Sequence, residues 1–196
     1  MKPLDTFVLL RRAIGACVLA GFGTVWAAAA VFSAPAGWRL GLGLGLAFTA
    51  ACVGVAALHT LLGARTARKA QPATPLSAAD QIARRRVGRR MGLINAGQGV
   101  AIALVSVVAA RAGRPDLIMF AVALVVGLHF FALAPVLHMP SYAFCGALVV
   151  VAAIAGAVAP AGPGRAVGVA LAVALILWTT ALDITRRLQM AAVSIA

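Results

Sequence analysis

Five side chains that can bind a proton or a polar solute lie inside long apolar stretches of the sequence. They are His59, Asn95, Gln98, His129 and Asp183. An imidazole titrates near neutral pH, and amides and carboxylates hold small polar molecules through hydrogen bonds. A polar group placed at bilayer depth costs free energy, so each one needs an explanation. We interpret all five as candidate substrate- or proton-binding residues.

His129 is the strongest candidate for a titrating group. Pro135 follows six residues later and cannot donate a hydrogen bond to the carbonyl of Phe131, which predicts a broken or kinked helix there. A freed carbonyl beside an imidazole could bind a solute or pass a proton. In the alternative interpretation, a neutral imidazole is hydrogen-bonded to a neighbouring helix.

Two of the polar residues have simpler alternatives. Asp183 is followed by Arg187 at i+4, so the carboxylate can be satisfied within its own helix. Otherwise it faces the bundle as a proton acceptor near His59 or His129. His59 is expected near a cytoplasmic helix end, where it can reach the headgroups.

The amides belong to a line of small residues. Gly92, Asn95, Gly99, Ile102 and Ser106 recur at steps of three and four residues, which predicts a helix–helix seam with Asn95 bonded across it. In the alternative, Asn95 and Gln98 open a small polar cavity.

A second ridge of small residues comprises Gly37, Gly41 and Gly45. Such ridges indicate close helix packing, either within the chain or between copies in a homodimer.

These residues must be positioned by membrane helices. The chain has 196 residues, 63% of them hydrophobic, in blocks of about 20, which is the length that crosses a bilayer as a helix. We therefore predict an all-α, polytopic helix bundle forming a single transmembrane domain over residues 1–196. Six spans are expected, at 13–32, 40–63, 91–110, 117–136, 143–160 and 166–185. The rival is five spans with a re-entrant segment around 135–142.

The net charge of +13 is distributed unevenly over the predicted loops. With six spans, thirteen Lys and Arg residues fall on the side of the two termini and only four on the other. The positive-inside rule then places both termini in the cytoplasm. We expect a multi-pass protein of a bacterial inner membrane, whose first helix is not cleaved. The same charge attracts anionic headgroups.

Residues 64–90 are predicted to form a basic cytoplasmic loop. Ser77 and Asp80 resemble a capping box, which predicts a helix over about 78–90 that continues into the third span. Its arginines form a basic patch at the membrane surface: Arg84, Arg85, Arg86, Arg89 and Arg90. The patch could anchor the chain to lipid or dock an acidic partner. Nucleic acid is not expected, because no aromatic residues alternate with the basic ones.

The three outer turns resemble one another. The turns "APAGWRLG", "ARAGRPDL" and "PAGPGRAVG" each place Ala-Gly before an arginine, which suggests three tandem helical hairpins.

Enzymatic chemistry is not expected. The sequence contains no nucleotide-binding, zinc-protease or serine-hydrolase motif, and its three cysteines form no metal-ligand pattern, so we predict no catalytic residue, metal or cofactor.

The segment "GLHFFALAPVLHMPSYAFCGALVVV", downstream of "GLINAGQGVAIAL", resembles a pattern in small uncharacterised bacterial membrane proteins. The matching positions are Gly127, Leu128, His129, Phe130, Pro140, Tyr142 and Gly146. The resemblance implies no activity, because none is known for that family.

Two functions remain open from the sequence. The first is a transporter for a small solute, coupled to protons, with a polar pocket between helices. The second is a non-transporting accessory or scaffold subunit that binds a partner or anionic lipid.

Overall fold

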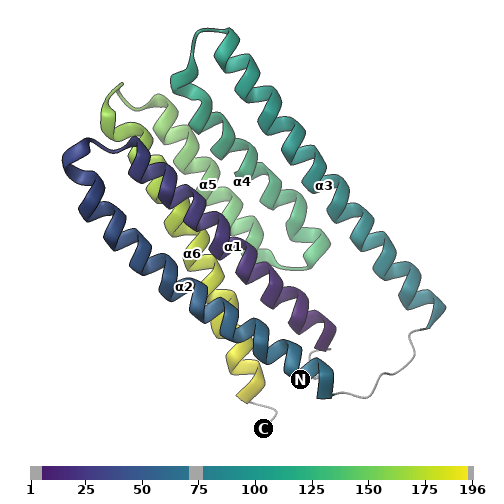
Figure 1. Cartoon of the computed structure of the whole chain (residues 1–196). Helices are drawn as coiled ribbons and strands as arrows, with labels where there is room; N and C mark the ends of the chain where they lie inside the picture. The colour runs from purple at the N-terminus through teal and green to yellow at the C-terminus, as the bar shows by residue number, and fades with distance from the viewer. Residues whose placement is uncertain (1–5, 71–76, 194–196) are drawn as a thin grey trace. The chain divides into compact units, whose positions relative to one another are not determined.

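A computed structural model describes residues 6–70 and 77–193, and in this part of the chain every regular element is helical. Six α-helices follow one another (Figure 1): α1 (Thr6–Ser33), α2 (Ala36–Ala70), α3 (Ala78–Arg111), α4 (Ile118–Leu137), α5 (Pro140–Val158) and α6 (Pro163–Val193). A single 3-10 turn, η1 (Pro115–Leu117), precedes α4.

Each predicted span lies on a different helix, so the expectation of an all-α chain with six membrane-length helices is confirmed. Every helix is long and apolar enough to cross a membrane. Lipid provides no hydrogen-bond partners for the backbone, and a helix satisfies its own amide and carbonyl groups. The chain is therefore an integral, multi-pass membrane protein.

Two helices are longer than a bilayer requires. α2 has 35 residues and α3 has 34. At ~1.5 Å per residue each extends for roughly 50 Å, against a hydrocarbon core of about 30 Å. The surplus in α2 follows the predicted span, because the helix continues from residue 63 to Ala70. In α3 the surplus is the arginine-rich start of the helix.

The basic segment is therefore mostly helical rather than a loop. The predicted helix start is confirmed, since Ser77 is the N-cap of α3, its hydroxyl accepts a hydrogen bond from the Asp80 amide at 3.1 Å, and α3 begins at Ala78. The same hydroxyl donates to the Asp80 carboxylate at 2.6 Å, so the Asp80 side chain bonds to the Ser77 hydroxyl. The same helix continues without a break into the third apolar stretch. The predicted linker around Pro72 and Pro75 lies outside the described residues.

The segment between α4 and α5 is a turn between two separate helices, as the six-span prediction requires. His138 adopts a left-handed conformation with φ of 54° after the last residue of α4, and Pro140 occupies the first turn of α5. The expected break at Pro135 is wrong, because α4 continues through Pro135 to Leu137. The alternative, a kink at Pro135, stays a prediction. Pro135 cannot donate to the Phe131 carbonyl in the turn before it, so α4 includes its last two residues without that hydrogen bond.

Contacts along the chain divide it into two compact units. Unit 1 comprises 1–73 and 174–196, and thus α1, α2 and the later part of α6. Unit 2 comprises 74–173, which holds α3, η1, α4, α5 and the start of α6.

Unit 1 is held by small residues around one large side chain. Trp178 is buried, and its indole Nε1 donates a hydrogen bond to the Ala20 carbonyl at 3.2 Å. A Cβ atom at Gly23 would lie 2.5 Å from the indole ring, so only glycine leaves room for it. The buried face of α1 is otherwise made largely of alanines, which allows close approach of its neighbours.

Unit 2 is held by a contact between glycines on α4 and α5. A Cβ atom at Gly146 would lie 2.7 Å from the Gly127 carbonyl oxygen, and one at Gly127 would lie 2.7 Å from Val150 Cγ2. Gly156 is enclosed by Phe120 of α4 and Val169 of α6 in the same way. These helices approach too closely for any larger residue at the contact.

Arginines close two of the three outer turns. Arg39 donates hydrogen bonds to the carbonyls of Phe32 and Ala34, at the end of α1. Arg165 donates to the Ala159 carbonyl at 3.4 Å, at the end of α5. Each reaches back from the second helix of a hairpin to the end of the first, where carbonyls lack helical partners. Arg114, in the middle turn, pairs with Asp116 instead.

Candidate functional site on the exposed face of α3

The five candidate binding residues fall into two separate groups. His59 on α2 and Asp183 on α6 belong to unit 1, whereas Asn95 and Gln98 on α3 and His129 on α4 belong to unit 2. Each group is described by itself.

In unit 1, Asp183 has the local partner that its spacing predicts. Its carboxylate accepts two hydrogen bonds from Arg187 Nε, at 2.8 and 3.0 Å, which confirms the i,i+4 pairing. The Arg187 side chain is 70% exposed, so such a pair contributes little to stability. His59 is exposed and lies beside the buried stripe of α2, which ends with Thr60 and Leu61.

In unit 2, α3 contacts α4 along one side yet contributes no buried residue. Its half-buried positions, including Met91, Ile94, Gln98 and Val105, repeat with a spacing of three and four residues and lie on that side. The opposite side carries exposed apolar residues such as Leu93 and Val100. This helix is the least enclosed membrane-length helix that the structure describes.

Asn95 lies between two glycines on an exposed strip of α3. Gly92, Asn95 and Gly99 are all exposed, and they lie roughly 60° to 120° around the helix from Gln98, at ~100° per residue. A Cβ atom at either glycine would meet nothing within 4 Å. No hydrogen bond joins the Asn95 amide to another described residue. We call Gly92, Asn95 and Gly99 the α3 strip.

No hydrogen bond joins Asn95 across the predicted seam among the described residues of unit 2. Ile102 and Ser106 are half-buried, whereas Gly92, Asn95 and Gly99 are exposed, with open space around both glycines. In unit 1, the ridge of Gly37, Gly41 and Gly45 on α2 is likewise exposed, with open space around each glycine. Close helix packing through either set of residues stays a prediction.

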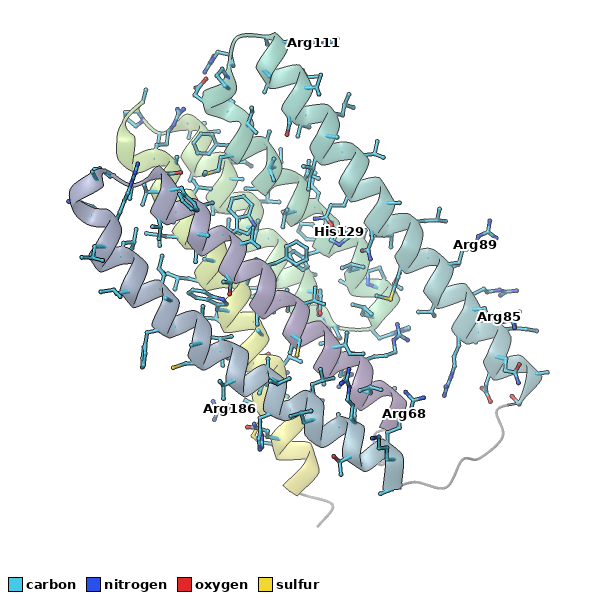
Figure 2. The ribbon with its side chains drawn as sticks, in the orientation of Figure 1. Arg68, Arg85, Arg89, Arg111, His129 and Arg186 are labelled. Atoms are coloured by element: carbon cyan, nitrogen blue, oxygen red, sulfur yellow. The ribbon has the colours of Figure 1, made fainter. Side chains whose placement is uncertain are left out.

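His129 is half-buried on α4 (Figure 2). Its ring meets Phe130 edge-on, with the centroids 6.0 Å apart, and Phe130 in turn lies 5.7 Å from the buried Tyr142. The ring contact of the imidazole is thus with the next residue along α4. No carboxylate or amide is hydrogen-bonded to the imidazole in the part of the chain that the structure describes.

None of the five candidate residues lines either of two hollows on the described surface. The first, of about 470 Å³, lies between α3 and the start of α4 and has an almost entirely apolar lining that includes Leu104, Val108 and Ala121. The second, also of about 470 Å³, lies at the ends of α1 and α2. The predicted polar pocket does not coincide with either hollow.

Charged side chains gather outside the apolar stretches. Arg85, Arg86, Arg89 and Arg90 are exposed on the first turns of α3, where Figure 2 shows Arg85 and Arg89. At the end of α3, Arg114 and Arg165 both bind Asp116, and the hydrogen bond to Asp116 raises the pKa of the Arg114 guanidinium.

The described residues include no group of three or more His, Cys, Asp or Glu side chains that could hold a metal ion.

Several residues that matter to the structure were not singled out for packing in the sequence. They are Gly23, Gly127, Gly146 and Gly156, together with the turn arginines Arg39 and Arg165. The repeated Ala-Gly-Arg turns were the available signal for the arginines. Gly127 and Gly146 occur in the Gly-Leu-His-Phe resemblance, which pointed to positions but not to their contact.

Comparisons with protein-family models, curated proteins and solved structures gave no match. The resemblance to small bacterial membrane proteins therefore stays a prediction.

Proposed function

We propose that this protein is a non-transporting scaffold subunit of a bacterial inner membrane, which assembles with a second copy of itself through the α3 strip. The observation that carries the proposal is the position of Asn95. This amide is exposed on a membrane-length helix, is flanked by open glycines and has no hydrogen-bond partner among the described residues.

Its environment in a membrane makes a partner necessary. Asn95 lies four residues inside the apolar stretch that begins at 91, hence at a depth of ~6 Å. Lipid chains offer its donors and acceptor nothing to bond, whereas an adjacent helix can supply both. Gly92 and Gly99, one turn to either side, let a second helix approach closely enough for that bond.

A second copy fits this chemistry because the strip is self-complementary. A carboxamide both donates and accepts, so Asn95 can bond to Asn95 of an identical helix across a two-fold axis. The glycines at i−3 and i+4 then line the same contact on each side. Copies inserted in one orientation present their strips at the same depth, which such a parallel pair requires.

The charge distribution supports the orientation. The positive-inside bias favours cytoplasmic termini and places the arginine-rich start of α3 in the cytoplasm. A dimer through the α3 strip would hold two such basic segments side by side, where they can meet anionic lipid or an acidic partner. This display is the scaffold role that we propose.

The transporter alternative would require a polar, water-filled pocket around Asn95, Gln98 and His129. The hollow between α3 and the start of α4 is lined by none of these three residues and is almost entirely apolar, which favours the scaffold.

Disulfide crosslinking in native membranes tests the proposal. Gly92→Cys and Gly99→Cys place a thiol on the strip and leave Asn95 intact, so we expect each to give a covalent dimer on mild oxidation. Leu93→Cys and Val100→Cys are matched controls, because both positions are exposed at similar depth but lie on the other side of α3. We expect no more dimer from these than from the wild type, whose own cysteines set the background.

Equal crosslinking at all four positions would indicate random collision, and no crosslinking at 92 and 99 would remove the second copy as the partner. Either outcome contradicts the proposal.

A further inference from the structure

A hollow at one end of unit 1 combines an apolar wall with a cluster of cations. Its volume is about 470 Å³, and it is lined by Leu10 and Ile14 of α1 and by Arg65, Arg68 and Lys69 of α2. We call it the α1–α2 groove. α1 and α2 contact each other along their length, and Figure 2 shows Arg68 at the end of α2 beside the first turns of α1.

The cations of the groove are close together and have no described counter-ion. Arg65, Arg68 and Lys69 are spaced at i, i+3 and i+4, so they share one face of α2. All three side chains are exposed, and the described lining of the groove includes no carboxylate. No ion pair joins the three cations to another described residue. An anion bound here would therefore meet three positive charges from the described lining.

The groove lies where a lipid headgroup would be. The apolar stretch of α2 ends near residue 63, so Arg65 begins within one turn of the hydrocarbon boundary. On the facing helix, Ile14 lies at the start of an apolar stretch that continues for more than five turns. Leu10 lies one turn before Ile14, and Arg11 and Arg12 lie between them in the sequence. Long basic side chains at such a boundary hold their charge at headgroup level and their stems against apolar neighbours.

We propose that the α1–α2 groove is a binding site for an anionic phospholipid. The phosphate of the headgroup lies among Arg65, Arg68 and Lys69, and the start of an acyl chain lies against Leu10 and Ile14. A free anion would pair with the cations but would leave the apolar wall uncovered. A lipid without a charged headgroup would contact the apolar wall but would leave the cations unpaired. An anionic phospholipid matches both parts of the lining, which is why we assign this ligand.

Native mass spectrometry of the purified full chain measures the binding. The probes are a short-chain phosphatidylglycerol, the corresponding phosphatidylcholine and inorganic phosphate, each added below its micelle concentration where that applies. We expect phosphatidylglycerol to bind about tenfold more tightly than phosphatidylcholine, which corresponds to roughly one to two well-placed cations. Inorganic phosphate should not displace phosphatidylglycerol at the same concentration.

Two variants that lose the same number of positive charges distinguish lipid binding in the groove from attraction of anionic lipid to the net charge of the protein. The combined variant Arg65→Gln, Arg68→Gln, Lys69→Gln should lose the preference for phosphatidylglycerol. The control Arg85→Gln, Arg89→Gln, Arg90→Gln removes three exposed charges from unit 2 and should keep it. All six side chains are exposed, so neither variant disturbs a core. Ile14→Gln tests the apolar wall and should also weaken phosphatidylglycerol binding.

Three results would overturn the assignment. An equal loss in both triple variants would mean that net charge alone attracts the lipid. Displacement by inorganic phosphate would mean a free-anion site, and unchanged binding in the groove variant would place the lipid elsewhere.

Discussion

Replacing Gly146 with alanine should destabilise the protein by about 2 kcal/mol, although alanine is the better helix former. The added Cβ atom would lie 2.7 Å from the Gly127 carbonyl oxygen and 3.1 Å from Phe130 Cβ. The nearer contact is backbone, which cannot rotate away, so α4 and α5 must separate. Thermal unfolding in detergent should show a lower midpoint temperature.

Gly168→Ala is the matched control for this prediction. Gly168 lies in the same unit on α6, is exposed, and has nothing within 4 Å of an added Cβ atom. Alanine loses less backbone entropy than glycine when a helix forms. The free energy of unfolding of this variant should therefore be unchanged or higher by up to ~1 kcal/mol. If Gly146→Ala unfolds at the same temperature as Gly168→Ala, the close contact of α4 and α5 is wrong.

Replacing Asn95 with leucine should weaken self-association about tenfold. Hydrogen bonds between membrane helices contribute roughly 1–2 kcal/mol in model peptides, and each factor of ten corresponds to about 1.4 kcal/mol. Energy transfer between labelled copies in lipid vesicles, measured across a dilution series in lipid, gives the association constant. Because Asn95 is exposed and no hydrogen bond joins it to another described residue, the unfolding temperature of the monomer should not fall.

Gln98→Leu separates this effect from a general response to losing an amide. Gln98 is half-buried on the α4-facing side, so its loss should leave association unchanged. Asn95→Gln keeps the carboxamide and should retain part of the association. Two results would show that the α3 strip is not the contact between copies. In the first, Asn95→Leu associates as tightly as the wild type; in the second, Gln98→Leu associates more weakly than Asn95→Leu.

The fold could be predicted from the sequence because lipid restricts a chain to few solutions. Apolar blocks of about 20 residues have to be helices, and the capping box at Ser77 marked a helix start to the residue. The prediction of a break at Pro135 was wrong because a missing hydrogen bond weakens a helix without ending it. Pro135 cannot donate to the Phe131 carbonyl, yet α4 continues for two residues beyond it.

The packing and the site were less predictable because the positions of small residues in the sequence do not show which helix they contact. Gly37, Gly41 and Gly45 form the most regular ridge, yet they face open space, whereas Gly127 and Gly146 are isolated in sequence and touch each other. Spacing within one helix says which residues share a face, but it carries no information on which helix that face meets. For Asn95 the period predicted a seam, and no hydrogen bond joins its amide to another described residue, so the seam stays a prediction.

Water access to the three membrane-embedded candidates of unit 2 tests the scaffold account most directly. Native membranes that contain one of three variants, Asn95→Cys, Gln98→Cys or His129→Cys, would be treated with a membrane-impermeant maleimide. Labelling of the wild type gives the background. Ala83→Cys, in the basic start of α3, is the positive control and should react rapidly from the cytoplasmic side. The scaffold account predicts no labelling above background at 95, 98 and 129, because helices or lipid cover them. Labelling of all three at a rate close to that of Ala83→Cys would show a water-filled path between the helices and would contradict it.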